Sequence, residues 1–326
     1  MAGPAITNIF LTFAAIGNRE DLIDTIYNVS PVDAPFSASI GKVKAEATLH
    51  EWQTDVLATA ATNAVVQGDD ILSGYTFAAV TPTVRLGNRT TISRKDVAVS
   101  GTQDAVNKAG RKKEMVYQLL KRSKELNRDM EFTLCSRLAK STGDASTAPT
   151  LAALEMWYGA TTSASTANVS RGTGGSNASN SQAGGPTDGT TRALTESLLK
   201  GVLQGCWTNG GDVDLLMPGP FNKTVISTFT GNNTRIQDTS DKKLIAAINV
   251  YVSDFGTHKV MANRFSRDRT LHCLMTDMWA VATLRPKQTI DLAKTGDNEK
   301  AMLICEYTLE SRNDSGSGVV ADLTTA

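Results

Sequence analysis

The stretch LHEWQTD, Leu49 to Asp55, gathers side chains that could do chemistry. It places His50 beside Glu51 and close to Asp55, in a chain that contains only three histidines. An imidazole next to a carboxylate can act as a general base or bind a divalent metal ion. An enzyme that uses His50 with Glu51 or Asp55 is therefore one hypothesis for the function.

Strand geometry argues against that hypothesis. In a β-strand, successive side chains point to opposite faces. Alternation divides the stretch into two sets of side chains, which are His50, Trp52 and Thr54 on one face and Glu51, Gln53 and Asp55 on the other. A strand here would anchor its tryptophan and pair its charges with another segment, rather than assemble a catalytic group.

The rest of the sequence supplies no partner for such a site. His258 and His272 lie far away in the C-terminal half, and His272 and Cys273 would point to opposite faces of a strand. The motifs G-x-x-x-x-G-K, G-x-S-x-G, H-E-x-x-H and C-x-x-C are all absent. We therefore predict that the protein is not an enzyme and has no catalytic residue, no metal site and no cofactor.

The composition is that of a globular protein without a strong overall charge. Thirty-three basic residues balance thirty-three acidic ones, so no net field attracts nucleic acid or a membrane. No apolar run reaches the roughly 20 residues of a membrane span, and the run from Ile6 to Ile16 lacks the basic start of a signal peptide. The four widely spaced cysteines are typical of buried, reduced thiols in a cytoplasmic product.

Two N-terminal segments cannot be stable by themselves. Residues 1–48 lack sustained periodicity and contain Pro31 and Pro35, which predicts an extended arm with a short helix near Arg19–Tyr27. Residues 49–99 contain two strand-like flanks, which predicts one long two-stranded ribbon. A lone ribbon is marginally stable in water, so both segments must lie on something else.

A long helix is predicted over residues 103–140. Ser100 and Gln103 fit a capping box at its start. One apolar stripe recurs at helical spacing and consists of Val116, Leu119, Leu126, Met130, Leu134 and Leu138. The opposite face is basic, which fits either a solvated face or a surface that meets nucleic-acid phosphates.

The C-terminal half is predicted to be mixed α/β. Residues 159–191 are almost wholly small and polar, which predicts a long exposed loop. Helical patterns follow at 192–207 and 221–229, and strand-like runs at 212–217, 248–254, 258–263, 270–275, 278–284 and 300–323, the last with a turn. The whole is a mixed α+β protein whose arm and ribbon need neighbouring subunits, as in rings or lattices built by head-to-tail contacts.

Four segments in the same order resemble one known family. They are E-W-Q-T-D at Glu51 to Asp55, V-S-G-T-Q at Val99 to Gln103, K-E-L-x-R-D-x-E at Lys124 to Glu131, and the terminal EYTLESRNDSGSGVV. The chain resembles the major capsid proteins of tailed bacteriophages, most strongly over residues 45–140.

The resemblance implies the capsid fold shared by tailed phages and herpesviruses. Its parts would be an N-terminal arm at 1–48, an extended β-hairpin loop at 49–99, a spine helix at 100–141, a peripheral domain at 142–207 with the low-complexity insertion 159–191, an axial domain at 208–262, and return strands at 263–326. The implied function is self-assembly into pentamers and hexamers of an icosahedral shell around double-stranded DNA, inside the host cytoplasm and then in the virion. An encapsulin-like compartment of the same fold is the alternative.

The resemblance also implies partners and contact residues. The partners would be other copies of the chain, scaffolding, portal and decoration proteins, and packaged DNA through non-specific contact, but no membrane. We expect a subunit interface at Glu51, Trp52, Asp55, Arg85, Arg89, Arg94 and Lys95. We expect a DNA-facing surface at Lys112, Lys113 and Lys121.

Overall fold

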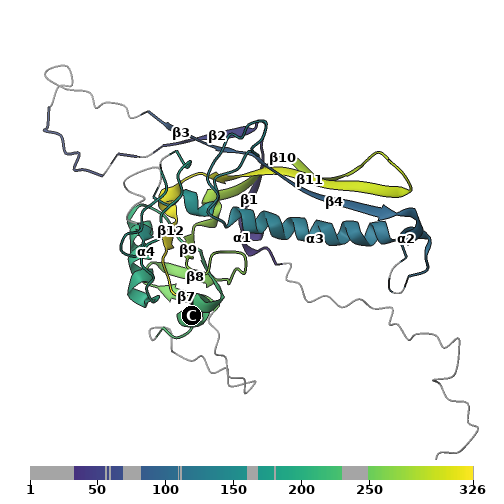
Figure 1. Ribbon diagram of the computed structural model, residues 1–326. Coiled ribbons are helices and arrows are strands. Elements are labelled where there is room, and N and C mark those ends of the chain that lie inside the picture. The colour runs from purple at the N-terminus through teal and green to yellow at the C-terminus, as the bar shows by residue number, and fades with distance from the viewer. Residues whose placement is uncertain are drawn as a thin grey trace, which may run out of the picture.

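The protein consists of two β-sheets on a shared core, a long helix along one sheet, and a separate two-stranded ribbon (Figure 1). This computed structural model describes residues 33–55, 57–58, 60–68, 82–108, 110, 112–159, 168–179, 181–229 and 249–325. The four-stranded sheet and the helix extend away from the six-stranded sheet, and the ribbon projects in the opposite direction. The molecule is therefore elongated, with a projection at each end.

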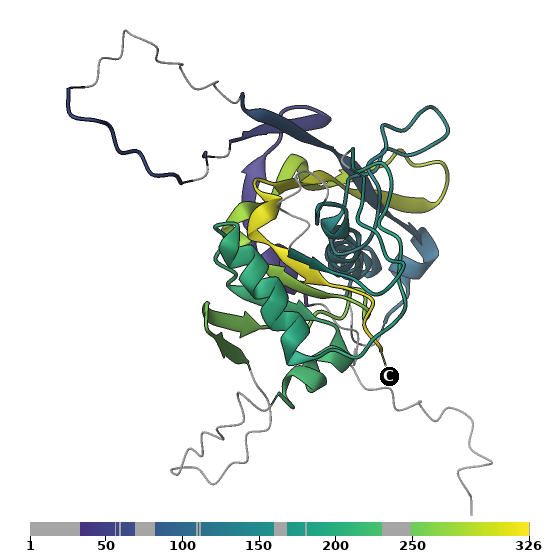
Figure 2. The ribbon, with the colours of Figure 1, turned by 90° about the vertical axis from the view of Figure 1, so that its left-hand side faces the viewer.

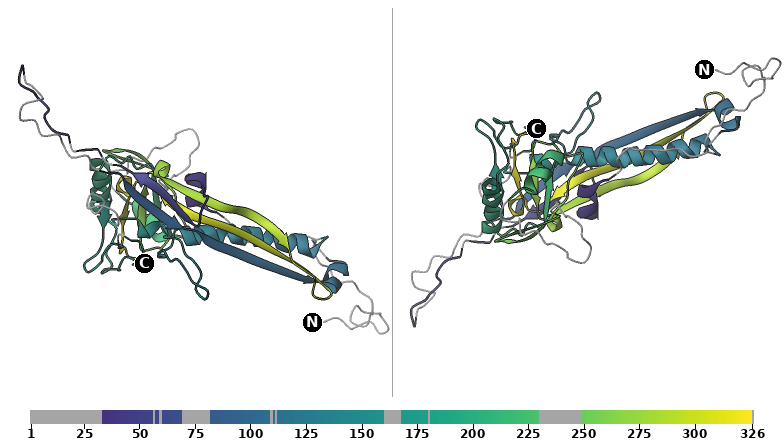
Figure 3. Two further views of the ribbon diagram at one scale, coloured as in Figure 1. Left: turned by 90° about the horizontal axis from the view of Figure 1, so that it is seen from above. Right: turned by 90° about the horizontal axis from the view of Figure 1, so that it is seen from below.

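The four-stranded sheet carries the long helix α3 (Glu114–Leu134) on one face (Figure 3). Its strands, in spatial order, are β1 (Gly41–Lys44), β10 (Trp279–Asp291), β11 (Asn298–Ser311) and β4 (Thr91–Ser100). β1 runs parallel to β10, and the other neighbours are antiparallel. Val97 and Val99 of β4 are buried with Met115 of the helix, because alternate side chains of a strand share one face.

The prediction of one helix over 103–140 is wrong in its extent. Ser100 does cap a helix, since its hydroxyl accepts the amide of Gln103, but α2 (Gly101–Ala105) ends after five residues. The chain then turns through Gly110, whose φ of +74° is not helical. α3 has 21 residues, which at 1.5 Å per residue is about 30 Å.

Asp104 stabilises the break between the two helices. Its carboxylate accepts the first amide of α3, that of Glu114, at 3.0 Å. This backbone hydrogen bond is the main reason why the pKa of Asp104 lies below its ordinary value. Along α3 the predicted stripe buries Leu126 and Leu134 but leaves Val116 53% exposed, and its neighbour Met115 is the apolar residue that is buried in the first turn.

The six-stranded sheet is covered on one face by α4 (Glu196–Thr208) (Figure 2). Its strands, in spatial order, are β5 (Val169–Ser170), β12 (Gly318–Val320), β9 (Leu271–Leu274), β6 (Leu215–Pro218), β8 (Gly256–Val260) and β7 (Val250–Ser253). Val202 and Cys206 of α4 pack so closely over Gly318 that a β-carbon there would lie 2.6 Å from Val202. Helix α5 (Pro220–Ile226) starts at a proline, as predicted.

The shared core lies between the two sheets. It contains the segment 151–158, whose Trp157 and Tyr158 are fully buried, together with Trp279 of β10. A second core, on the other side of the six-stranded sheet, contains the apolar face of α4. Burial of large aromatic side chains supplies much of the hydrophobic stabilisation of such a domain.

The end of the predicted arm belongs to the body. Residues 35–39 form α1 (Pro35–Ser39), whose Phe36 is fully buried against Trp279 at a ring-centroid distance of 6.4 Å. The next residues form β1. The proline-containing sequence predicted an arm because one turn of helix and a short edge strand show no periodicity. The predicted helix near Arg19–Tyr27 lies outside the described residues.

The ribbon is shorter than predicted. β2 (Leu49–Thr54) and β3 (Val84–Arg89) pair with each other in an antiparallel two-stranded sheet. The chain leaves the ribbon at Thr90 and enters the four-stranded sheet, so residues 91–99 are not part of the hairpin. Arg94 and Lys95 therefore lie on β4 and not on the ribbon.

The low-complexity tract is a loop that is packed in part and exposed in part. In its described parts, 168–179 and 181–191, Asn168, Ala178 and Gln182 are buried, whereas residues such as Thr173 and Thr187 are exposed. The prediction of a long exposed loop therefore holds only in part, because composition shows how little apolar surface a segment has, but not which polar partners it will find. Here those partners are backbone groups and arginines of the body.

The strands and helices predicted after residue 191 are confirmed. Three 3-10 helices, η2 (Leu154–Met156), η5 (Thr276–Met278) and η6 (Asp314–Gly316), complete the described elements. The six-stranded sheet combines residues from 169 to 320, so the expected limits at 208 and 263 cut through it, and α4 packs with it. Among the described helices, none combines the length and apolar character needed to cross a membrane.

Candidate functional site

The ribbon places the stretch LHEWQTD as alternation predicts. Trp52 is half-buried toward the body, whereas Glu51, Gln53 and Asp55 are exposed on the other side. His50 and Trp52 share a face, with their rings 5.7 Å apart. Trp52 in turn packs against the buried Trp157 at 5.5 Å. The tryptophan is therefore an anchor of the ribbon, as expected.

His50 is held by the body and not by the carboxylates of its own stretch. Its Nε2 lies 3.0 Å from Oε2 of Glu310 on β11, and Glu310 also accepts a hydrogen bond from Arg312 at 2.9 Å. Within the described residues, no group of three or more histidine, cysteine, aspartate or glutamate side chains is placed to hold a metal ion. The contact with Glu310 fastens the base of the ribbon.

Asn88 is the second fastening point of the ribbon, and sequence reasoning missed it. It is fully buried. Its amide group donates to the carbonyl oxygens of Ala152 and Leu309, at 3.0 and 2.7 Å, and its oxygen accepts the amide of Ala152 at 2.8 Å. Lys140 donates to the carbonyl oxygen of Gly87 at 3.0 Å. The base of the ribbon is thus rigidly attached to both β11 and the core.

The charged residues expected at an interface fall on two separate surfaces. On the ribbon, Arg85 pairs with Glu51 at 3.3 Å, and the arginine side chain is 72% exposed. On β4, Arg94 pairs with Asp96 at 3.3 Å, while Lys95 points to the other face and pairs with Asp129 of α3. Arg89, at the end of β3, is half-buried. Of these expected interface charges, Glu51, Arg85 and Arg89 therefore lie on the ribbon, and the two others lie on β4.

The three lysines expected to face DNA are all exposed. Lys112 and Lys113 precede α3, and Lys121 lies on its outer face. None of them forms an ion pair with another residue in the part of the chain that the structure describes. They remain available for an anionic partner, although they are not drawn together into one tight cluster.

Glu131 of α3 is a buried carboxylate that sequence reasoning also missed. Its side chain is inaccessible to solvent, and it accepts the amides of Phe36 and Ser37 at 2.7 and 2.9 Å. The side chain of Asn263 donates a third hydrogen bond at 2.8 Å. One carboxylate therefore joins α1, α3 and the segment after β8. The available signal was its place at the edge of the apolar stripe.

The cysteines behave as inert core residues. All four are buried and unpaired with one another. Burial raises the pKa of the Cys206 thiol to about 12 and that of Cys305 to about 11. Because the thiolate is the reactive form, neither residue is placed for redox or nucleophilic chemistry, in keeping with the expectation of buried, reduced thiols.

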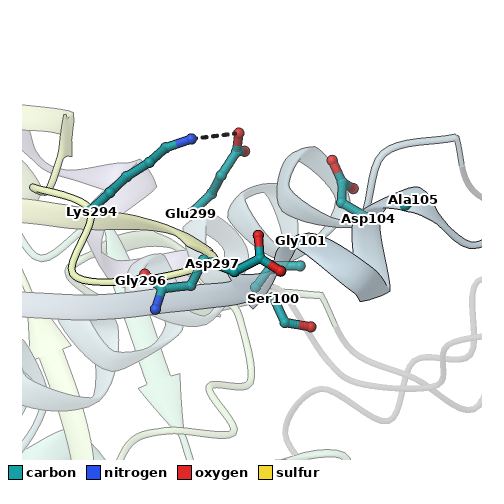
Figure 4. Close-up of a pocket in the computed structure, with 10 residues that line it drawn as sticks. Ser100, Gly101, Asp104, Ala105, Lys294, Gly296, Asp297 and Glu299 are labelled. Atoms are coloured by element: carbon teal, nitrogen blue, oxygen red, sulfur yellow. Dashed lines mark ion pairs between the residues drawn. The ribbon is translucent and has the colours of Figure 1, made fainter.

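A polar pocket of about 440 Å³ lies where the β10–β11 turn meets α2 (Figure 4). The carbonyl oxygen of Asp297 accepts the amide of Gly101 at 3.1 Å. Lys294 points toward Glu299 and pairs with it at 3.7 Å. Of the ionisable groups that line it, Asp104 accepts the amide of Glu114, and Lys294 is paired with Glu299. The contacts of the pocket fasten the far end of the four-stranded sheet.

Comparison with known proteins decides what this architecture is for. The family model for the SU10 major capsid protein matches residues 5–324. The chain belongs to the SU10 major capsid protein family. It is a structural subunit of the icosahedral shell of a tailed phage, and this membership confirms that it is not an enzyme.

Individual relatives agree with this assignment. The chain is 28% identical over 352 residues to a major capsid protein of Escherichia phage Phieco32, covering 98% of this chain and 97% of that protein. Its fold is similar to that of the capsid asymmetric unit of Cyanophage A-1(L), with a TM-score of 0.65, 14% identity, and coverage of 98% and 100%.

Two further solved structures share the fold. A native GTA particle capsid has a TM-score of 0.62, 9% identity, and coverage of 96% and 98%. A structure of the major capsid proteins and decoration proteins of phage G has a TM-score of 0.51, 10% identity, and coverage of 98% and 100%. The family match and the relative in phage Phieco32 favour the phage capsid over the encapsulin-like alternative. The solved structures confirm the expected mixed α+β capsid fold.

Proposed function

We propose that this capsid protein forms the pentamers and hexamers of the shell through its ribbon, which reaches over a neighbouring subunit while packaged DNA fills the interior. The observation that carries this proposal is the contrast within the ribbon. Its base is fixed by buried contacts, whereas Val84, at the other end of the ribbon, is 56% exposed, and Leu57, just beyond β2, is 94% exposed. Exposed apolar side chains on a projection are typical of a surface that a partner covers.

The ribbon charges are proposed to pair with the neighbour as well as within the chain. Exposed pairs such as Glu51 with Arg85 contribute only about 0.2–1 kcal/mol each. A closed shell repeats every contact many times, so small contributions sum. We also propose that the four-stranded sheet and α3 form the peripheral part and the six-stranded sheet forms the axial part, in place of the limits at 208 and 263 expected from the sequence.

Reversing the charge of Arg85 and Arg89 together is expected to impair assembly without unfolding the subunit. Arg85 is exposed, so its loss costs the monomer little, but the reversed charges would repel an acidic partner on the neighbour. The yield of particles after sedimentation checks assembly, and circular dichroism of the unassembled subunit checks folding.

Lys200→Glu on α4 is the matched control, because Lys200 is also exposed and also pairs with a local glutamate, Glu196, at 3.0 Å. Particle yield should stay normal for this control. Normal particles from the Arg85→Glu, Arg89→Glu protein would refute a role of these charges in assembly.

The outer face of α3 and the residues just before this helix are proposed to line the interior and meet DNA phosphates. Changing Lys112, Lys113 and Lys121 to glutamine should leave folding intact, because all three are exposed, and should weaken DNA retention. Loss of phosphate contacts lowers affinity and its dependence on salt. The DNA remaining per particle after a salt wash measures this.

The control carries the same three charge losses at exposed lysines elsewhere, Lys200, Lys259 and Lys294. Equal DNA retention in both triple variants would show that α3 does not face the DNA.

Other partners follow from the same assignment. We propose that scaffolding and portal proteins act with this chain during assembly in the host cytoplasm. A decoration protein is a further candidate, supported by the phage G structure, which contains decoration proteins beside the capsid proteins.

A further inference from the structure

The low-complexity tract contributes one carboxylate on which three arginines converge. The Asp188 carboxylate accepts a hydrogen bond from Arg137 at 2.7 Å, and both of its oxygens accept hydrogen bonds from Arg267 at 3.1 Å or less. The guanidinium group of Arg269 lies 3.5 Å from the same carboxylate. Arg267 also pairs with the buried Glu155 at 2.9 Å. We call these five residues the Asp188 clasp.

The arginines of the clasp come from different parts of the fold. Arg137 follows the C-terminal end of α3, which lies along the four-stranded sheet. Arg267 and Arg269 lie on the segment that leads into β9, an inner strand of the six-stranded sheet. Asp188 therefore connects the helix of one sheet to the entry of the other through a single charged group.

The clasp is stronger than an ordinary surface ion pair. The side chains of Asp188 and its three arginines are each about one third exposed or less, so water screens the charges only in part. Burial alone would raise the pKa of Asp188, but the hydrogen bond and charge of Arg267 and the charges of Arg137 and Arg269 outweigh it and lower the pKa. Without Asp188, the acidic partners left to these three partly buried arginines among the described residues would be Glu155 and the more distant Asp322.

We propose that Asp188 is a positioning residue that fixes the orientation of α3 and its sheet relative to the six-stranded sheet. Asp188 thereby narrows the range of curvatures of the shells that the subunit can build. One chain must fill different positions in a closed shell, so the range of angles within each subunit limits the range of particle sizes. The inference rests on the shell-forming function proposed above.

Asp188→Asn tests this, because asparagine keeps the shape and removes the charge. Hydrogen exchange of residues 181–191 in the unassembled subunit should rise by roughly tenfold or more, as the tract opens more easily. The distribution of particle diameters in electron micrographs should broaden, and Asp188→Glu should restore a narrow one. Asp144→Asn is the matched control, since the Asp144 carboxylate bonds only to Ser146 and Thr147 of its own exposed loop.

A second variant keeps the test decisive if Asp188→Asn does not fold. Arg137→Gln removes only the link to α3 and leaves Arg267 and Arg269 on Asp188, and it too should broaden the diameters. Narrow, wild-type diameters from either folded variant would overturn the inference. The shell-forming function fails separately, if the unaltered chain forms no particles at all.

Discussion

Replacing Glu131 with alanine is expected to lower the free energy of unfolding of the unassembled subunit by roughly 3–5 kcal/mol. The side chain is fully buried and accepts three hydrogen bonds from Phe36, Ser37 and Asn263. Its removal leaves the buried Phe36 amide and the partly buried Ser37 amide without this acceptor, and leaves Asn263 only weak sulfur acceptors. Each buried donor left unsatisfied costs about 1–3 kcal/mol. Guanidinium denaturation followed by tryptophan fluorescence measures the change.

Glu125→Ala on the same helix is the control for this substitution. Glu125 pairs with Arg122 one turn away at 2.7 Å and is partly exposed, so its loss should cost less than about 1 kcal/mol. Proteolysis between residues 33 and 40 should speed up only in Glu131→Ala, because α1 loses the carboxylate that holds its first amides. Equal losses of stability in the two variants would contradict the account of Glu131 as the joint between α1 and α3.

Acid is expected to destabilise the subunit through His272. This side chain is fully buried on β9, with Nδ1 3.1 Å from the hydroxyl of Tyr158 and Nε2 3.1 Å from that of Ser266. Burial, and then the charge of Arg267, lower its pKa from 6.5 to about 3. Between these values the unfolded chain binds a proton that the folded chain does not, so stability falls as the pH falls from about 6.5 toward 3.

The size of this effect follows from the shift. Linkage gives about 3 kcal/mol lost by pH 4.5, and roughly 4 kcal/mol once the pH reaches 3. His272→Gln removes the titration while keeping one donor and one acceptor. Urea denaturation of both proteins at pH 7 and pH 4.5 isolates the contribution, because other titrating groups are common to both. If the free energy of unfolding falls by the same amount between pH 7 and pH 4.5 in both proteins, His272 is not the cause of the acid sensitivity.

The sequence predicted those parts of the fold whose patterns are local. Alternation around Trp52 placed the ribbon strand and divided its charges correctly, and Pro220 located the start of α5. These successes have one physical cause, which is that side-chain alternation and backbone restrictions act between near neighbours in the chain. The same alternation removed His50 from consideration as a catalytic group.

Features that depend on distant partners were not predictable. The ribbon was predicted to be too long because β4 has the same alternating pattern as β3. The two strands differ only in their partners, since β4 pairs with β11 and β3 pairs with β2. Nothing local shows that Glu131 meets the amides of α1, or that Asp188 meets arginines from the segments that follow α3 and precede β9. Gly110 was a usable signal that one continuous helix over 103–140 must break between α2 and α3, since glycine is unfavourable inside a helix.

Electron microscopy of the purified chain under native conditions tests the central claim most directly. The account predicts closed particles of uniform diameter, with clusters of five and six subunits visible on their surface. A monodisperse small monomer, with no particles at any protein concentration, would contradict it.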